Sequence, residues 1–336
     1  MSLSVGLKRA LRPLAFRLRQ TLDRAGRILR PPASWDGRHH PALLQFTPWE
    51  GRADGRFQYD FLGVKTDPRF RPQIRPDPPG PLKTGYPAPY AGYFELAFVL
   101  ESLAEAACAD RFTILELGAG YGPWMVTAHR ARELTSAKPI NLVGVEMVPR
   151  HYEWMHVHLT NNGIDPGKHR LIHAAVSDVD GEALYLPEEN PWLDYGQSLI
   201  RRRRLEAEGE APIPAEPART TARDAETHGP VRVPAIELAR LLRDQQRVDL
   251  MHADIQGEER RALPAAIDEL NLRVHRLIVA THSNRIHREL RRLLAEAGWR
   301  IVFDFRCRKR ERTAYGDVKF LDGLLACVNE SRSRLH

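Results

Sequence analysis

The chain has 336 residues, of which 43% are hydrophobic and 28% charged, enough for one large domain with extensions or for two small domains. Its formal net charge of +7 comes from residues 1–30, which hold eight basic residues and one acid, so the balanced remainder argues against nucleic acid as a partner. Three widely spaced cysteines predict free thiols in a reducing compartment. With no apolar run of about 18 residues and no secretory signal pattern, we expect a cytoplasmic protein without a transmembrane helix.

Residues 1–30 have the pattern of a basic amphipathic helix. Apolar residues recur every three or four positions from Leu3 to Leu29, and arginines occupy much of the rest. Pro13 predicts a kink or two short helices. Such a helix suits an anionic membrane surface, as a peripheral attachment at the inner face. It equally suits packing on the protein's own body or on a partner, and an organelle transit peptide is a third interpretation.

Residues 31–92 are rich in proline and glycine, with isolated aromatic residues between them. Such a composition predicts an irregular arm wrapped on the body. A helix is expected next, over Phe94–Ala107. We therefore divide the chain into the helix of residues 1–30, the arm of residues 31–92 and a main domain of residues 93–330.

The main domain alternates apolar runs of strand length with helical stretches. This alternation predicts an α/β fold of Rossmann type, with a mostly parallel seven-stranded sheet between two layers of helices. A last apolar run follows a loop too short for a crossover helix, so it is expected to pair antiparallel. The predicted strands are Phe112–Leu117, Ile140–Glu146, Arg170–Val176, Val248–Asp254, Val274–Thr281, Arg300–Phe305 and Phe320–Val328. The predicted helices between them include Val148–Asn162, Gly257–Leu272 and Arg285–Ala297.

Residues 201–230 interrupt this alternation. Arg201–Arg204 and the Ala/Pro/Glu-rich stretch after them predict a solvated, mobile insertion. Contact of the arginines with phosphate or a membrane is the second interpretation.

A glycine-rich loop follows the first predicted strand directly. It runs from Glu116 through Gly118, Ala119 and Gly120 to Gly122, and Pro123 suits the first turn of the helix after it. The spacing departs from the dinucleotide fingerprint, whose third glycine would fall at position 123. An acid just before the first glycine is instead typical of S-adenosylmethionine sites, although a tight strand-to-helix turn would also explain the glycines.

Two acids end later strands of the predicted sheet. Glu146 ends the second strand, where a carboxylate of this fold class accepts both ribose hydroxyls of a nucleoside. Asp254 ends the fourth, at the edge where open α/β sheets bind ligands. Structural explanations remain open, because Glu146 suits a strand terminus at the surface and Asp254 suits a helix N-cap. Glu259 in the next helix would favour the helix dipole.

Two histidines lie on later strands. His282 follows the fifth predicted strand and is a candidate for catalysis as much as for a structural role. His252 lies lower in its strand and is expected to be a hydrogen-bonded core residue.

Together, in this order, these motifs resemble the FkbM-type methyltransferase family over roughly residues 90–305. The segment Asp254–Glu259 meets the family's Asp-(Val/Ile)-(Glu/Gln)-Gly-x-Glu run, and Glu116, Gly118 and Gly122 meet its glycine loop. Ala175–Asp178 resembles the segment after its third strand. Two positions depart from it: the family often has Asn where Gly120 stands, and Ala280 replaces the acid of its Glu-x-His strand end.

The resemblance implies a class I methyltransferase fold that transfers a methyl group from S-adenosylmethionine to oxygen, frequently on sugars or other natural products. Asp254 or His282 would accept the hydroxyl proton, and Glu259 would orient that base or hold the acceptor. The donor would contact residues of the glycine loop and residues at the ends of the second, third and fourth predicted strands. These are Glu116, Gly118, Ala119, Gly120, Glu146, Met147, Ala175, Val176 and Asp254.

The acceptor is expected to be a sugar or glycan, lipid-linked if residues 1–30 bind a membrane. Tyr93, Tyr195, Gln197 and Gln256 are its predicted contacts, although the residues around Tyr195 equally suit packing of the insertion. No metal is predicted. Two other functions compete: a nicotinamide-dependent oxidoreductase, which the glycine spacing disfavours, and a membrane-attached interaction protein with an inactive nucleotide-binding domain.

Overall fold

The computed structural model describes residues 34–136, 138–187, 192, 194–196, 199 and 230–330. The predicted helix of residues 1–30 and almost all of the predicted insertion at 201–230 lie outside these residues. Within the described part of the chain, no helix is both long enough and apolar enough to span a membrane.

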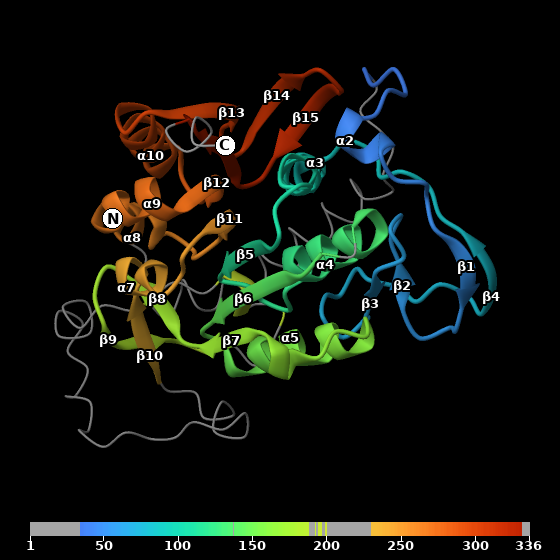
Figure 1. Ribbon diagram of the computed structural model, residues 1–336, viewed down its shortest axis with the longest axis horizontal. Coiled ribbons are helices and arrows are strands. Elements are labelled where there is room, and N and C mark those ends of the chain that lie inside the picture. The colour runs from blue at the N-terminus through green and yellow to red at the C-terminus, as the bar shows by residue number, and fades with distance from the viewer. Residues whose placement is uncertain are drawn as a thin grey trace, which may run out of the picture.

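A seven-stranded sheet forms the centre of the molecule (Figure 1). Its order is β13-β16-β12-β11-β5-β6-β7, and only β16 runs antiparallel to its neighbours. The predicted mixed sheet with an antiparallel last strand is therefore confirmed. The strands are β5 (Phe112–Leu117), β6 (Ile140–Glu146), β7 (Arg170–His173), β11 (Val248–Ala253), β12 (Val274–Thr281), β13 (Trp299–Phe305) and β16 (Gly323–Asn329).

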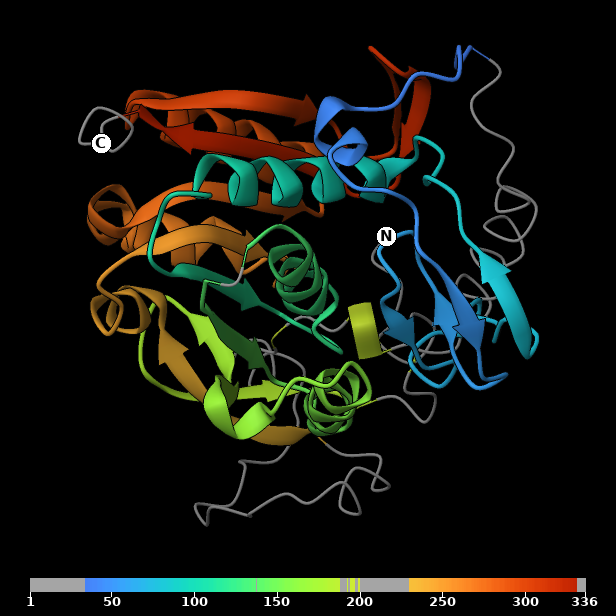
Figure 2. The ribbon, with the colours of Figure 1, turned by 45° about the vertical axis from the view of Figure 1, so that its right-hand side comes forward.

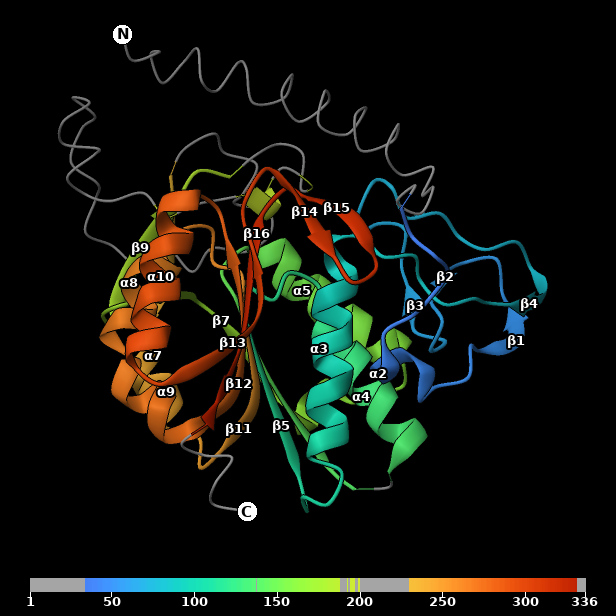
Figure 3. The ribbon, with the colours of Figure 1, turned by 90° about the horizontal axis from the view of Figure 1, so that it is seen from above.

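Helices cover both faces of this sheet, which Figure 3 shows edge-on. One face carries α3 (Ala91–Glu105), α4 (Pro123–Thr135) and α5 (Pro149–Asn161). The other carries α7 (Leu238–Arg243), α8 (Glu259–Ala265), α9 (Ile267–Arg273) and α10 (Asn284–Glu296). Buried β5 and β11 send alternate side chains into two apolar clusters, one under each helical layer. Burial on both faces explains why apolar residues predominate in these strands.

Three predicted elements have different bounds in the structure. The run Arg170–Val176 is split, because only β7 joins the central sheet and β8 (Ala175–Ser177) joins another. The single helix expected over Gly257–Leu272 is two, α8 and α9, separated at Ala266. Phe320 belongs to a hairpin, β14 (Lys309–Thr313) and β15 (Gly316–Phe320), so the last central strand begins three residues later than predicted.

A second, three-stranded sheet lies beside the first and was not predicted. Its order is β8-β10-β9, with β9 (Gly181–Tyr185) and β10 (Val231–Glu237) on the two sides of the predicted insertion. Tyr185, Val231 and Val233 bury their side chains in a small core with Val148 and Ala175. This sheet places Ala175 and Val176 next to the end of β6, where the predicted site begins.

The arm of residues 34–92 is more ordered than predicted. It contains a one-turn helix, α2 (Pro41–Leu44), and two small antiparallel sheets, β1 (Glu50–Ala53) with β4 (Gly80–Lys83) and β2 (Gln58–Tyr59) with β3 (Lys65–Thr66). Figure 2 shows this blue segment beside α3 and α4. Phe61 and Leu62 belong to the same apolar cluster as those helices, and Phe70 stacks on Tyr121 with ring centroids 4.9 Å apart. The arm is therefore part of the folded body.

Candidate active site

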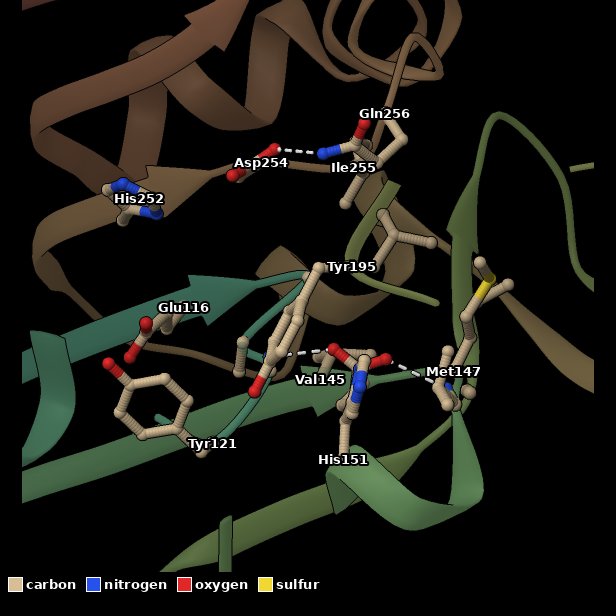
Figure 4. Close-up of a pocket in the computed structure, with 18 of the residues that line it drawn as sticks. Glu116, Tyr121, Val145, Met147, His151, Tyr195, His252, Asp254, Ile255 and Gln256 are labelled. Carbon is tan, nitrogen blue, oxygen red and sulfur yellow. Dashed lines mark hydrogen bonds between the residues drawn. The ribbon is translucent and has the colours of Figure 1, made fainter. Parts of the chain in front are cut away.

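A pocket opens where β5, β6 and β11 end, with an empty volume of about 820 Å³ that includes solvent at its mouth (Figure 4). All of the predicted donor residues line it, and so does Gln256. These lining residues are Glu116, Gly118, Ala119, Gly120, Glu146, Met147, Ala175, Val176, Asp254 and Gln256. Parallel strands deliver them to one edge because their carboxyl ends point the same way.

The glycine loop adopts a backbone that other residues rarely reach. Gly118, Gly120 and Gly122 have φ values of +67°, +58° and +72°. A Cβ on Gly118 would lie 2.0 Å from the backbone oxygen of Asp254, so the first glycine is needed for the approach of β5 to the end of β11. A Cβ on Gly120 would lie 2.9 Å from the ring of Tyr195. The absence of side chains thus lets the Asp254 backbone approach the loop at Gly118 and the Tyr195 ring approach it at Gly120.

Glu116 and Glu146 hold the two ends of this loop through backbone groups. Glu116 accepts the N–H of Met125 at 2.9 Å in the first turn of α4, and Glu146 accepts the N–H groups of Gly120 and Val148, both at 2.7 Å. Burial raises the pKa of each carboxyl to about 7, because these hydrogen bonds offset only part of the cost of removing a carboxylate from water. Both acids line the pocket, where a bound cation would offset the cost of ionising them.

Asp254, His282 and Glu259 form a compact cluster at the ends of β11 and β12. His282 Nε2 lies 3.1 Å from Asp254 Oδ1, and its Nδ1 lies 3.4 Å from Glu259 Oε1. These contacts act as ion pairs, since neither has the angle of a hydrogen bond. Burial alone would lower the pKa of His282, but the two carboxylates outweigh it and raise the pKa to about 11. His282 is therefore an imidazolium at neutral pH.

The same cluster sets the charge of Asp254. Burial would raise the pKa of this carboxyl, but His282 outweighs it and the pKa lies below the ordinary 3.8. Glu259 has a different task, because its oxygens accept the N–H groups of Ile255 and Gly257, both at 2.8 Å. It is fully buried and holds the turn after β11. Of the three, Asp254 alone lines the pocket.

The ligand atoms of these three side chains lie within 4.8 Å of one another, close enough together for a metal ion. The geometry of the cluster does not fit one. The two ring nitrogens of His282 face different carboxylates, and both oxygens of Glu259 already accept backbone hydrogen bonds. A metal would have to break this arrangement to gain its ligands.

Of the four predicted acceptor contacts, two line the pocket, one is buried in the core and one lies outside the described residues. Tyr195 and Gln256 line the pocket, and Gln256 donates from Nε2 to Asp254 Oδ1 at 2.9 Å. Tyr195 stacks on His151 at 4.0 Å and stands in the middle of the pocket in Figure 4. The structure contradicts the contact predicted for Tyr93, which is 0% exposed and whose hydroxyl accepts the N–H of His40 at 2.5 Å. Gln197 lies outside the described residues.

Sequence reasoning missed several side chains of the pocket. Arg71 comes from the arm, Tyr121 lies in the glycine loop, Trp124 follows that loop, and His151 lies on α5. His252 is buried and lies 3.3 Å from Glu95 as predicted for a core residue, yet it also lines the pocket. Its position two residues before Asp254 on the same strand face was the available signal. Arg71 has no fixed spacing from any motif.

The sheet order, the glycine loop after its first strand and the acids ending the first, second and fourth strands together define a class I methyltransferase. Residues 116–301 match the family model described as the methyltransferase FkbM domain. A relative from Jannaschia sp. (strain CCS1), which is named as a methyltransferase, is 30% identical to the chain over 248 residues. The match covers 73% of this chain and 82% of the relative. The chain belongs to the FkbM methyltransferase family.

Two solved structures are also similar to the chain. Methyltransferase FkbM from Methylobacillus flagellatus KT has a TM-score of 0.39 and 11% identity, over 65% of this chain and 44% of that one. An O-methyltransferase from Bacillus cereus in complex with S-adenosylhomocysteine has a TM-score of 0.35 and 12% identity, over 68% of this chain and 79% of that one. Membership of the family rests on the family model and the Jannaschia relative, and it implies S-adenosylmethionine as the methyl donor.

Proposed function

We propose that the protein transfers the methyl group of S-adenosylmethionine to a hydroxyl oxygen of a sugar, glycan or related natural product. The observation that carries this proposal is Asp254, an ionised carboxylate in the same pocket as the glycine loop, with 40% of its side-chain surface exposed. It is available to a hydroxyl group, while His282 stabilises its charge and Glu259 holds the turn that follows it.

The donor fits the pocket by the chemistry of its lining. Glu146 would hold the ribose, because each carboxylate oxygen that accepts one backbone N–H keeps a second lone pair for a hydroxyl group. Ala175 and Val176 offer buried apolar surface for the adenine beside it. Gly118, Ala119 and Gly120 line the pocket with backbone and one methyl group, which leaves room for the ligand along the loop. Glu116 favours a positive charge at the other end of the loop.

S-adenosylmethionine, when bound, supplies an electrophilic methyl carbon on a positively charged sulfur. Asp254 accepts a hydrogen bond from the acceptor hydroxyl, which orients that oxygen, and takes its proton. A carboxylate with a lowered pKa stays ionised at neutral pH but binds a proton weakly, so orientation is its larger contribution. His282 has no free lone pair as an imidazolium, so its proposed role is to position Asp254. Glu259 would hold the loop of Ile255 and Gly257.

The acceptor class is supported by the character of the rim. Tyr195, Gln256 and Glu258 place a phenol, an amide and a carboxylate among the residues that line the pocket. Polar groups with an adjacent ring are suited to a hydroxyl-rich ligand such as a sugar. The basic amphipathic sequence of residues 1–30 supports a lipid-linked glycan at an anionic membrane surface as the acceptor.

The test is transfer of a labelled methyl group to a panel of glycans and lipid-linked glycans. Wild type should label a hydroxyl, and Asp254→Asn should lower kcat by about 100-fold or more while donor affinity changes little. Asp244→Asn is the matched control, because Asp244 pairs with Arg170 at the surface. Full turnover by Asp254→Asn would remove this residue from the mechanism. Donor binding without transfer to any hydroxyl acceptor would reject the O-methyl assignment.

A further inference from the structure

Arg71 brings the arm into the pocket. Its guanidinium carbon lies 4.2 Å from the ring centroid of Tyr195 and 5.9 Å from that of Tyr121, within the range of cation–π contacts. The residue before it, Phe70, is fully buried against Tyr121, and Ile74 donates its N–H to the backbone oxygen of Arg71 at 3.1 Å. The arginine is therefore held by a folded turn of the arm.

Charge makes this position unusual. Arg71 is the single lysine or arginine among the described residues that line the pocket, and four acids line it as well: Glu116, Glu146, Asp254 and Glu258. In the described part of the chain, Arg71 contacts the rings of Tyr121 and Tyr195 and the Tyr121 hydroxyl. It also feels the more distant charge of Asp254, but none of its direct contacts there is with a carboxylate. A guanidinium so enclosed, with no carboxylate to pair with, is suited to an anionic ligand group.

The arrangement of the pocket indicates which group that is. If the ribose lies at Glu146, as the proposed function requires, the rest of the donor extends along the glycine loop toward Glu116 and Tyr121. That end of S-adenosylmethionine is an amino acid with one ammonium and one carboxylate. Glu116 complements the ammonium group, and Arg71 on Tyr121 complements the carboxylate.

We propose that Arg71 binds the carboxylate of the methyl donor, so that the arm completes the donor site. A guanidinium matches a carboxylate with two parallel N–H donors, a geometry that lysine cannot reproduce. This inference rests on the proposed donor site. It makes the chain before the methyltransferase motifs a part of the binding site and not only a support for the fold.

The experiment is calorimetric titration of the full chain with two ligands, S-adenosylhomocysteine and its decarboxylated analogue. Arg71→Met should weaken binding of S-adenosylhomocysteine by about 10- to 100-fold, the loss typical of a charge-assisted pair. The same substitution should leave the affinity of the decarboxylated analogue unchanged, because that ligand has no group for Arg71. Arg69→Met is the control, since Arg69 pairs with Asp67 and is largely exposed.

Two outcomes would overturn the assignment. Equal weakening of both ligands would mean that Arg71 only shapes the pocket. Unchanged binding of both ligands, with a raised KM for the acceptor, would place Arg71 on the acceptor. If Arg71→Met does not fold, the two ligands are compared on wild type and on Arg71→Lys. The assignment then requires that wild type binds S-adenosylhomocysteine more tightly than the decarboxylated analogue and that Arg71→Lys reduces this difference in affinity. No binding of S-adenosylhomocysteine by folded wild type would instead reject the donor site itself.

Discussion

Replacing Glu116 by glutamine tests the electrostatics of the pocket in the absence of any ligand. Glu116 is 2% exposed at the end of β5, and burial raises its pKa from 4.5 to about 7. Glutamine has almost the same shape and cannot ionise. The substitution therefore removes the titration of one buried acid while its side-chain oxygen can still accept the N–H of Met125.

The size and sign of the effect follow from that pKa. A rise from 4.5 to about 7 corresponds to about 3 kcal/mol between the two protonation states. Because the folded pKa is the higher one, the native state favours the neutral acid. Its stabilising contribution is complete below pH 4.5 and is lost as the pH rises through about 7. Relative to wild type, Glu116→Gln should gain about 3 kcal/mol in the free energy of unfolding between these two limits.

The assay is denaturant unfolding of the ligand-free protein at a series of pH values. Glu146 titrates in both proteins, so its contribution cancels in the difference, which reports Glu116 together with its effect on His252. Glu133→Gln on the exposed side of α4 controls for the loss of one negative charge. A difference between variant and wild type that stays flat across the pH range would refute the assignment of a raised pKa to Glu116.

Three further changes test other parts of the account. Gly118→Ala places a methyl group 2.0 Å from the backbone oxygen of Asp254, so it should lower Tm by about 5 °C or more and abolish binding of S-adenosylhomocysteine; wild-type melting and binding would contradict this. His282→Gln removes the cation that lowers the pKa of Asp254, so the acid limb of the pH–rate profile should move to higher pH, and an unmoved limb would exclude the coupling. Deleting residues 1–89 uncovers the apolar surface of α3 and α4, so the fragment should bind a hydrophobic dye and lose cooperative unfolding; a cooperatively folded monomer would show that the arm is dispensable.

The central sheet could be predicted because its strands are buried on both faces. β5, β6 and β12 have the predicted bounds, since each is a mostly apolar segment of strand length between more polar ones. The antiparallel last strand followed from loop length alone. The acids at the strand ends could be predicted for the same reason, because parallel strands bring their carboxyl ends to one edge.

Elements whose stability depends on distant partners could not be predicted. β9 and β10 flank the predicted insertion and pair across a long stretch of sequence, which no local pattern reveals. The small sheets of the arm have strands of two to four residues, too short to show an alternation of their own. Arg71 lies between β3 and β4 of this arm, so its contact with Tyr121 could be found only from the folded structure.

Chemical roles were harder to predict than positions. Asp254, His282 and Glu259 lie together as their strand ends suggested, but their tasks depend on which atoms each carboxylate already holds. Glu259 accepts two backbone N–H groups, so it holds the turn and does not face the pocket. Tyr93 begins the predicted main domain, yet its ring packs against Phe94 and Tyr315 in the core.

The most direct test of the donor site is calorimetric titration of the full chain with S-adenosylhomocysteine, with NAD as a parallel ligand. Glu146→Gln is the informative variant, because Glu146 ends β6 and faces the pocket. We predict micromolar binding of S-adenosylhomocysteine by wild type, at least about 10-fold weaker binding by the variant and no binding of NAD. A folded protein that binds NAD and not S-adenosylhomocysteine, or a variant that binds as tightly as wild type, would contradict the account.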